Sequence, residues 1–113
     1  MTTATISRWE KQKSEETEGV EKLLRGKSFQ RVDAYRYNPA SIRVRVVDAR
    51  FENLPPDQRD ALVEPVLDEL PERTQADIMM LLTFAPSELL ENGKLSRAKM
   101  LNAEFEEPTP SML

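Results

Sequence analysis

The sequence predicts an α+β domain built on a small three-stranded mixed sheet, in the order helix, strand, strand, helix, strand, helix, with a further C-terminal helix. Two segments of alternating polar and apolar residues flank a turn sequence and predict a β-hairpin. A short apolar run over residues 78–82 follows a helical segment and predicts a third strand. Because two strands of one sheet joined through a helix form a right-handed crossover, the third strand should run parallel to the second. The helices are expected to pack on the sheet.

The chain divides into one folded unit and two end segments. Residues 1–13 are predicted to form a flexible N-terminal arm, in which Ile6 and Trp9 are the large apolar residues. Residues 14–105 are predicted to form a single domain, because a chain of 113 residues is long enough for one hydrophobic core and not for two. Residues 106–113 hold two prolines and are expected to form a disordered tail.

The first element of the domain is predicted to be a helix that begins after Ser14. Serine is favoured at the N-cap, and the acidic residues that follow it complement the positive end of the helix dipole. Gly26 suits the position just after the last helical residue, because glycine readily adopts the left-handed conformation found there.

A β-hairpin is predicted to follow this helix. Residues 29–37 have the composition of a strand, and Asn38-Pro39-Ala40-Ser41 has that of a turn. Residues 42–46 alternate strictly between apolar and charged side chains, which is typical of a half-buried strand. The loop between the strands is expected to hold about four residues.

The register of this hairpin has two interpretations. With a four-residue loop, Tyr35 and Tyr37 share the apolar face with Val44 and Val46, and the arginines gather on the open face. With a shifted register, the tyrosines join the arginines. That second arrangement would be a stacking platform of the kind found in single-strand nucleic-acid binders.

The connection to the third strand is predicted to be one helix. Pro56 fits its first turn, where the missing N–H is harmless, and helical spacing of apolar residues continues to Leu70. Pro65 lies in the middle of this helix and should kink it. The strand that follows is expected to be buried on both faces, with Met79 and Met80 in the core.

Two helices are predicted to complete the domain. The first is short and runs from Pro86 to Asn92, where Gly93 closes it. Ser96 is expected to cap the second. The apolar side of this last helix would cover the second face of the sheet and consists of Ala98, Leu101 and Phe105.

The composition excludes several classes of function, because the chain has no cysteine and no histidine. It therefore has no disulfide framework, no thiolate metal site and no imidazole to act as a general base or metal ligand. No apolar run approaches the ~20 residues of a membrane span, and the N-terminus lacks a secretory apolar stretch. We therefore expect a cytoplasmic protein with no membrane partner, and the sequence assigns no catalytic residue, cofactor or metal site.

Three segments of the chain resemble the BolA family, over about residues 15–92. The first, residues 42–52, looks like the strand of that family that leads to an aromatic residue and then to glycine, where this chain has Asn53. The second, residues 58–63, looks like the family's Arg-His-Arg helix start, with Asp60 at the histidine. The third, residues 85–88, looks like its Thr-Pro-Glu-Glu helix start.

This resemblance implies a fold like that of a class II KH domain. It also implies the partners of the family, which are monothiol glutaredoxins that share an iron–sulfur cluster through histidine or cysteine. In that family a histidine lies near the start of the last strand, and this chain has Asp77 at that place. The chain contains neither histidine nor cysteine, so it lacks both types of cluster ligand. It also lacks the Gly-x-x-Gly loop of RNA-binding KH domains. The sequence therefore departs from the usual functions of both relatives.

Five residues are candidates for binding a partner. Four are arginines of the predicted hairpin, where opposed like charges would favour an anionic ligand or an acidic partner unless they pair within the fold. The fifth is Trp9, which either packs on its own domain or contacts another chain, since tryptophan is enriched at interfaces. The arginines are Arg31, Arg36, Arg43 and Arg45.

The leading hypothesis is a non-enzymatic protein-interaction domain that binds an unknown protein partner or forms a homodimer. A second hypothesis is nucleic-acid binding through the basic hairpin face, against which the net charge of −4 counts. A third is a small enzyme that works through carboxylates such as Asp57, Asp60 and Glu64, which are spaced three and four residues apart. A solvated helix face is the simpler interpretation of those carboxylates.

Overall fold

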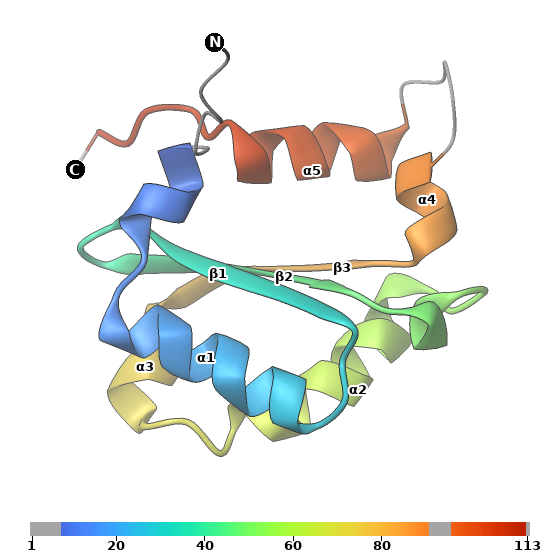
Figure 1. Ribbon diagram of the computed structural model, residues 1–113, viewed down its shortest axis with the longest axis horizontal. Coiled ribbons are helices and arrows are strands. Elements are labelled where there is room, and N and C mark those ends of the chain that lie inside the picture. The colour runs from blue at the N-terminus through green and yellow to red at the C-terminus, as the bar shows by residue number, and fades with distance from the viewer. Residues whose placement is uncertain (1–7, 91–95, 113) are drawn as a thin grey trace, which may run out of the picture.

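The structure is a computed structural model that describes residues 8–90 and 96–112. A three-stranded sheet lies in the middle, with α1, α2 and α3 below it and α5 above it (Figure 1). Helices thus cover both faces of one small sheet. The predicted fold class is confirmed.

The sheet has the predicted mixed topology. β1 (Arg31–Asn38) pairs antiparallel with β2 (Ser41–Val47), and β2 pairs parallel with β3 (Ile78–Phe84). The strand order is β1-β2-β3, so β2 is central and both other strands are edges.

The hairpin adopts the shifted register, and the prediction of a four-residue loop is wrong. Tyr35 lies opposite Arg43, and Asn38 lies opposite Ser41, with a bulge between Arg36 and Asn38. The side chain of Asn38 accepts a hydrogen bond from the N–H of Ala40 at 2.8 Å, which stabilises a tight turn of two residues. The bulge removes one residue from the pairing and so exchanges the two faces of β1.

The lower layer begins with α1 (Glu15–Gly26). Ser14 is its N-cap, as predicted, and the side-chain oxygen of Ser14 accepts a hydrogen bond from the N–H of Thr17 at 3.3 Å. Gly26 is the last helical residue and not the one after it, because Lys27 is the C-cap. The lower core unites residues of α1, the sheet and α2: Val20, Leu24, Phe29, Val32, Ala34, Ile42, Val44, Val46, Phe51, Val63, Leu67, Leu70 and Ala85.

The connection from β2 to β3 holds more elements than the single helix predicted. A short 3-10 turn, η2 (Ala49–Phe51), precedes α2 (Pro56–Leu67), and α3 (Glu72–Asp77) follows. Because α2 ends at Leu67 and not at Leu70, Pro65 lies in its last turn and not in its middle. Leu62, predicted to face the core, is 43% exposed.

The upper layer consists of α4 (Pro86–Leu90), α5 (Arg97–Glu106) and the N-terminal turn η1 (Arg8–Gln12). The side-chain oxygen of Ser96 accepts a hydrogen bond from the N–H of Lys99 at 3.2 Å, as expected of a cap. As predicted, α5 covers the second face of the sheet. This upper core is a separate cluster of Trp9, Tyr35, Val47, Leu82, Phe84 and Phe105. The predicted end of the preceding helix, at Asn92 and Gly93, lies outside the described residues.

Both chain ends differ from the predicted arm and tail. Trp9 is only 4% exposed, and its ring packs against those of Tyr35 and Phe105, so the described part of the predicted arm belongs to the domain. At the other end, Pro108 is buried, and the hydroxyl of Tyr37 donates a hydrogen bond to the carbonyl of Thr109 at 2.5 Å. Sequence alone missed these contacts because each joins residues far apart in the chain. Ile6 lies outside the described residues.

Candidate protein-interaction site

The arginine at the centre of β2, Arg45, is fully buried under α5. Its guanidinium donates to the carboxylates of Asp33 and Glu106, at 2.6 and 2.8 Å, and to the side-chain oxygen of Asn102 at 2.7 Å. Two carboxylates thus offset one buried charge, which would otherwise be strongly destabilising. One carboxylate from the hairpin itself and one from α5 therefore neutralise this arginine within the fold.

Arg43 is held on the same face by similar contacts. It donates to the carboxylate of Glu104 at 2.6 Å, and its guanidinium lies 3.7 Å from the ring centroid of Tyr37. Tyr35 beside it donates its hydroxyl hydrogen to the carbonyl of Phe105 at 2.8 Å, and burial raises the pKa of that hydroxyl. The tyrosines and arginines do share a face, but α5 covers it, so this face is not an accessible stacking platform.

The two remaining arginines lie elsewhere. Arg36 is on the lower face and pairs with Glu16 at 3.0 Å and with Asp77 at 2.9 Å. Arg31 is exposed at the start of β1 and pairs with Asp33 at 3.1 Å. The structure therefore does not bring the four arginines together on one surface, and the buried Trp9 packs on its own domain.

Asp60 and Asp77, which the sequence resemblance places at histidine positions of the BolA family, have ordinary structural surroundings. Asp77 pairs with Arg36 at the start of β3. Asp60 is half-buried on α2, where burial and then the charge of Asp57 raise the pKa of its carboxyl. Within the part of the chain that the structure describes, no group of three or more acidic side chains could hold a metal ion.

The edge of the sheet at β1 is closed by side chains. The N–H of Ala34 donates to the carboxylate of Glu21 at 3.0 Å, and its carbonyl accepts from the ammonium of Lys13 at 3.2 Å. The carbonyl of Val32 accepts from the guanidinium of Arg25 at 2.8 Å. These backbone groups would otherwise be free to pair with another strand.

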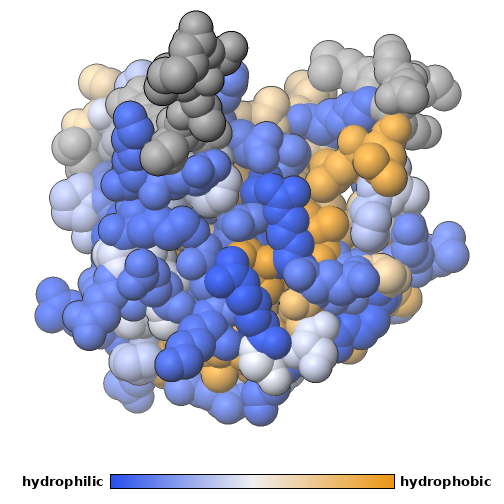
Figure 2. Space-filling view, viewed as in Figure 1, coloured by the Kyte–Doolittle hydropathy of each residue, from blue (hydrophilic) through white to orange (hydrophobic). Residues whose placement is uncertain are grey.

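The same closure continues to the end of β1. The carbonyl of Arg36 accepts a hydrogen bond from the side-chain amide of Gln12 at 3.0 Å. Figure 2, which views the molecule from the side of β1, shows a largely hydrophilic face, with hydrophobic side chains mainly beside α4. Four side chains from η1, α1 and the link between them thus occupy four outward backbone groups of alternate β1 residues, which opposes the addition of another strand at this edge.

The edge at β3 is different. The N–H of Asp48 donates to the carbonyl of Phe84 at 3.0 Å, so the backbone groups of Phe84 point toward β2. Because backbone groups alternate in direction along a strand, those of Leu82 also point toward β2, and those of Leu81 and Thr83 point outward. Only the carbonyl of Thr83 has a partner, the guanidinium of Arg59 at 3.0 Å. No other group of residues 8–90 and 96–112 bonds these outward atoms.

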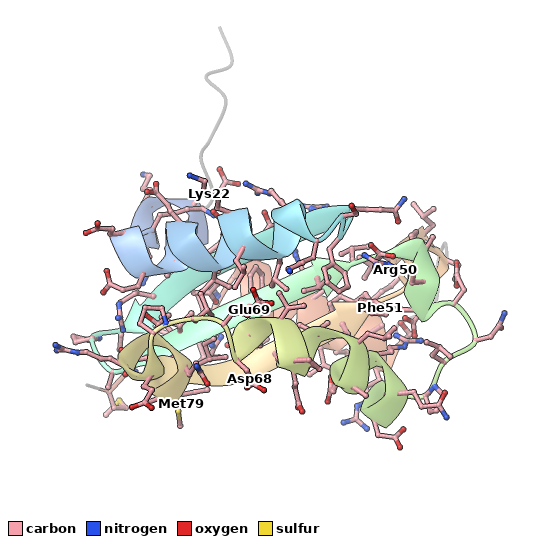
Figure 3. All side chains as sticks on the ribbon, turned by 90° about the horizontal axis from the view of Figure 1, so that it is seen from below. Lys22, Arg50, Phe51, Asp68, Glu69 and Met79 are labelled. Atoms are coloured by element: carbon pink, nitrogen blue, oxygen red, sulfur yellow. The ribbon has the colours of Figure 1, made fainter. Side chains whose placement is uncertain are left out.

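The side chains of β3 reinforce this difference. The strand Ile78–Phe84 contains no charged residue. Met79, predicted to be in the core, is 69% exposed at a register shift, and it points away from the domain at the sheet edge (Figure 3). Leu81 and Met80 are only half-buried, because an edge strand has a neighbour on one side alone. A neutral strand with unpaired backbone groups is an acceptor for another strand.

Sequence reasoning missed this site for two reasons. The apolar run predicted a strand buried on both faces, which is typical of central strands, whereas strand order places it at an edge. The residues that cover the opposite edge include Lys13 and Glu21. In the sequence these two cannot be distinguished from solvent-exposed charged residues near the start of a helix. The absence of charge in β3 was the one available signal.

A comparison with solved structures confirms the fold. The solution structure of the BolA1 protein from Mus musculus matches 85% of this chain and 81% of its own, with a TM-score of 0.54 and 21% sequence identity. The chain therefore has a BolA-like fold, as the resemblance implied. Asn53, at the position of the family's glycine, has a positive φ of 62°. No family model and no curated protein matches the sequence, and none of the described helices could span a membrane.

Proposed function

We propose that this protein is a non-enzymatic, cytoplasmic protein-interaction domain that binds its partner by adding a strand to the edge of β3. The observation that carries this proposal is the difference between the two sheet edges. Side chains occupy four outward backbone groups of β1, whereas on β3 no described residue bonds the backbone groups of Leu81 or the N–H of Thr83. Added strands gain main-chain hydrogen bonds, and the side chains of the edge provide selectivity.

The chemistry of the chain supports a binding role. With no histidine or cysteine, the protein cannot contribute the usual ligands of a shared iron–sulfur cluster. Nucleic-acid binding through the hairpin is disfavoured, because Arg43 and Arg45 are ion-paired under α5 and Arg36 lies on the other face. The proposed partner is therefore a protein that offers an extended segment.

Replacing Thr83 with proline tests this proposal. The N–H of Thr83 points outward, so Thr83→Pro removes no hydrogen bond of the fold and leaves the carbonyl for Arg59. It does remove a donor from the edge, and proline is tolerated there only because that N–H has no ladder partner. Met100→Lys is the matched control, because Met100 is 57% exposed, lies on α5 and contributes no backbone group to β3.

Affinity capture with tagged wild-type protein and both variants should show one class of partner that Thr83→Pro loses and Met100→Lys retains. In the captured complex, the N–H of Leu81 should become protected from hydrogen exchange, since it gains a partner. Partners that Thr83→Pro still binds, with Leu81 left unprotected, would overturn the role of this edge.

A further inference from the structure

We infer that the strand added to β3 is the β3 strand of a second copy of this chain, so that two domains share one continuous six-stranded sheet. This inference rests on the proposed function of the β3 edge. The two strands would run antiparallel about a two-fold axis at Leu81. Each copy would then present the same surface to the other, which is the commonest arrangement of soluble homodimers.

The unpaired atoms of β3 match this axis. Leu81 would lie opposite Leu81 of the second copy, and the two residues would exchange both N–H to carbonyl bonds, as a hydrogen-bonded antiparallel pair does. The N–H of Thr83 would face the carbonyl of Met79 of the second copy. The carbonyl of Thr83 would keep Arg59, its partner within the domain. The pairing thus uses the groups that the fold leaves free.

The charges near this edge do not oppose the pairing. The strand itself is neutral, so no like charges meet across the axis. Asp77, just before β3, is paired with Arg36 at 2.9 Å and would lie opposite Ala85 of the second copy. Arg59 is paired with Glu88 at 2.5 Å. Asp77 and Arg59 are therefore already compensated within their own domain.

The closed β1 edge limits the assembly to two copies. A β1-to-β3 contact between copies would be head-to-tail and would continue into an open filament. The side chains of Gln12, Lys13, Glu21 and Arg25 occupy four backbone groups of the β1 edge and so oppose that contact. Pairing between two β3 edges consumes the more open edge of each sheet, so the association closes as a dimer.

Cysteine cross-linking provides a direct test, because the chain has no cysteine of its own. In Leu81→Cys, the two introduced residues would face each other across the axis, with Cα atoms roughly 5.5 Å apart. That separation lies within the range that a disulfide spans. Mild oxidation should convert most of Leu81→Cys to a covalent dimer, and Trp9 fluorescence confirms that the variant is folded.

Met79→Cys is the control. Met79 is far more exposed than Leu81, so random collision would cross-link Met79→Cys at least as readily. About the proposed axis, however, the two copies of residue 79 are offset by four residues, or roughly 13 Å, and cannot form a disulfide. Equal cross-linking of the two variants, or faster cross-linking of Met79→Cys, would overturn the proposed axis.

Light scattering of the wild-type protein completes the test. Its mass should double between dilute and concentrated solution, and Thr83→Pro should stay monomeric throughout. If the wild-type protein remains monomeric, the inferred dimer is wrong. The proposed function still stands in that case if Thr83→Pro abolishes the capture of another protein. If the variant affects neither measurement, both the inference and the proposed function are wrong.

Discussion

Among the residues that the structure describes, two other than glycine adopt positive φ angles, and one of them suits that conformation better than the other. Asn53 has a φ of 62° at the turn before α2, and asparagine is among the residues that tolerate this region. Ser28 has a φ of 68° just after α1, where helices usually place glycine. Its N–H bonds the carbonyl of Arg25, which fixes the left-handed conformation in spite of the serine Cβ.

Replacing Ser28 with glycine should therefore stabilise the protein by about 1 kcal/mol, the strain of a left-handed residue with a Cβ. The Ser28 side chain is exposed and has no hydrogen bond to another described residue, so its removal sacrifices no contact. Urea denaturation of the wild type and of Ser28→Gly gives the difference. Asn53→Gly is the control, and its gain should be smaller. A loss of stability in Ser28→Gly would show that the turn is not strained.

At the scale of elements, the order of helices and strands could be predicted from local patterns, but the surroundings of the hairpin could not. Alternation in residues 42–46 predicted the strand β2, although this strand is buried on both faces and not half-buried. Ser14 and Ser96 predicted two helix starts. The bulge after Arg36 reversed the faces of β1, since one residue decides which set of side chains faces the core.

The burial of Arg45 was equally beyond local reasoning. Its partners Asn102 and Glu106 lie 57 and 61 residues further along the chain, on α5, so no pattern near the hairpin reports them. Local patterns could not predict the site either. The position of β3 at an edge of the sheet, like the side chains that cover the opposite edge, depends on which elements meet in space.

One of the groups that hold the segment after α5 is the carboxylate of Glu104, which gives this segment a pH dependence. Glu104 accepts bonds from the hydroxyl and N–H of Thr109 and from Arg43. The hydroxyl of Thr109, and then Arg43, hold the pKa of the Glu104 carboxyl below its ordinary value. A carboxyl with a lowered folded-state pKa stabilises the fold above the unfolded-state pKa, and that contribution is lost as pH falls toward the folded-state pKa.

We therefore expect Glu104→Gln to be less stable than the wild type at neutral pH, and this difference to shrink as pH falls below the ordinary range of a glutamate. Denaturant unfolding of both proteins across that range measures the difference. Glu107→Gln is the control, because Glu107 is exposed at the end of α5, and it should follow the wild type. A constant difference between Glu104→Gln and the wild type would show that the contacts of Glu104 do not depend on its charge.

At the scale of the whole molecule, β2 belongs to both cores. Its residues alternate, so that Val44 and Val46 lie in the lower core while Val47 lies in the upper one, beside the buried Arg45. Neither layer can detach without exposing one face of the central strand. This arrangement argues that the domain unfolds as one cooperative unit, even though its two apolar clusters are separate.

The single tryptophan makes this cooperativity measurable. Trp9 lies in the upper core, packed on Tyr35 and Phe105, so its fluorescence reports that layer. Far-UV circular dichroism is dominated by the helices, most of which belong to the lower layer. The two signals should change at the same urea concentration, as a two-state transition requires. An earlier fluorescence transition would show instead that η1 and α5 separate first, and that the sheet can exist with its upper face, including Arg43 and Arg45, uncovered.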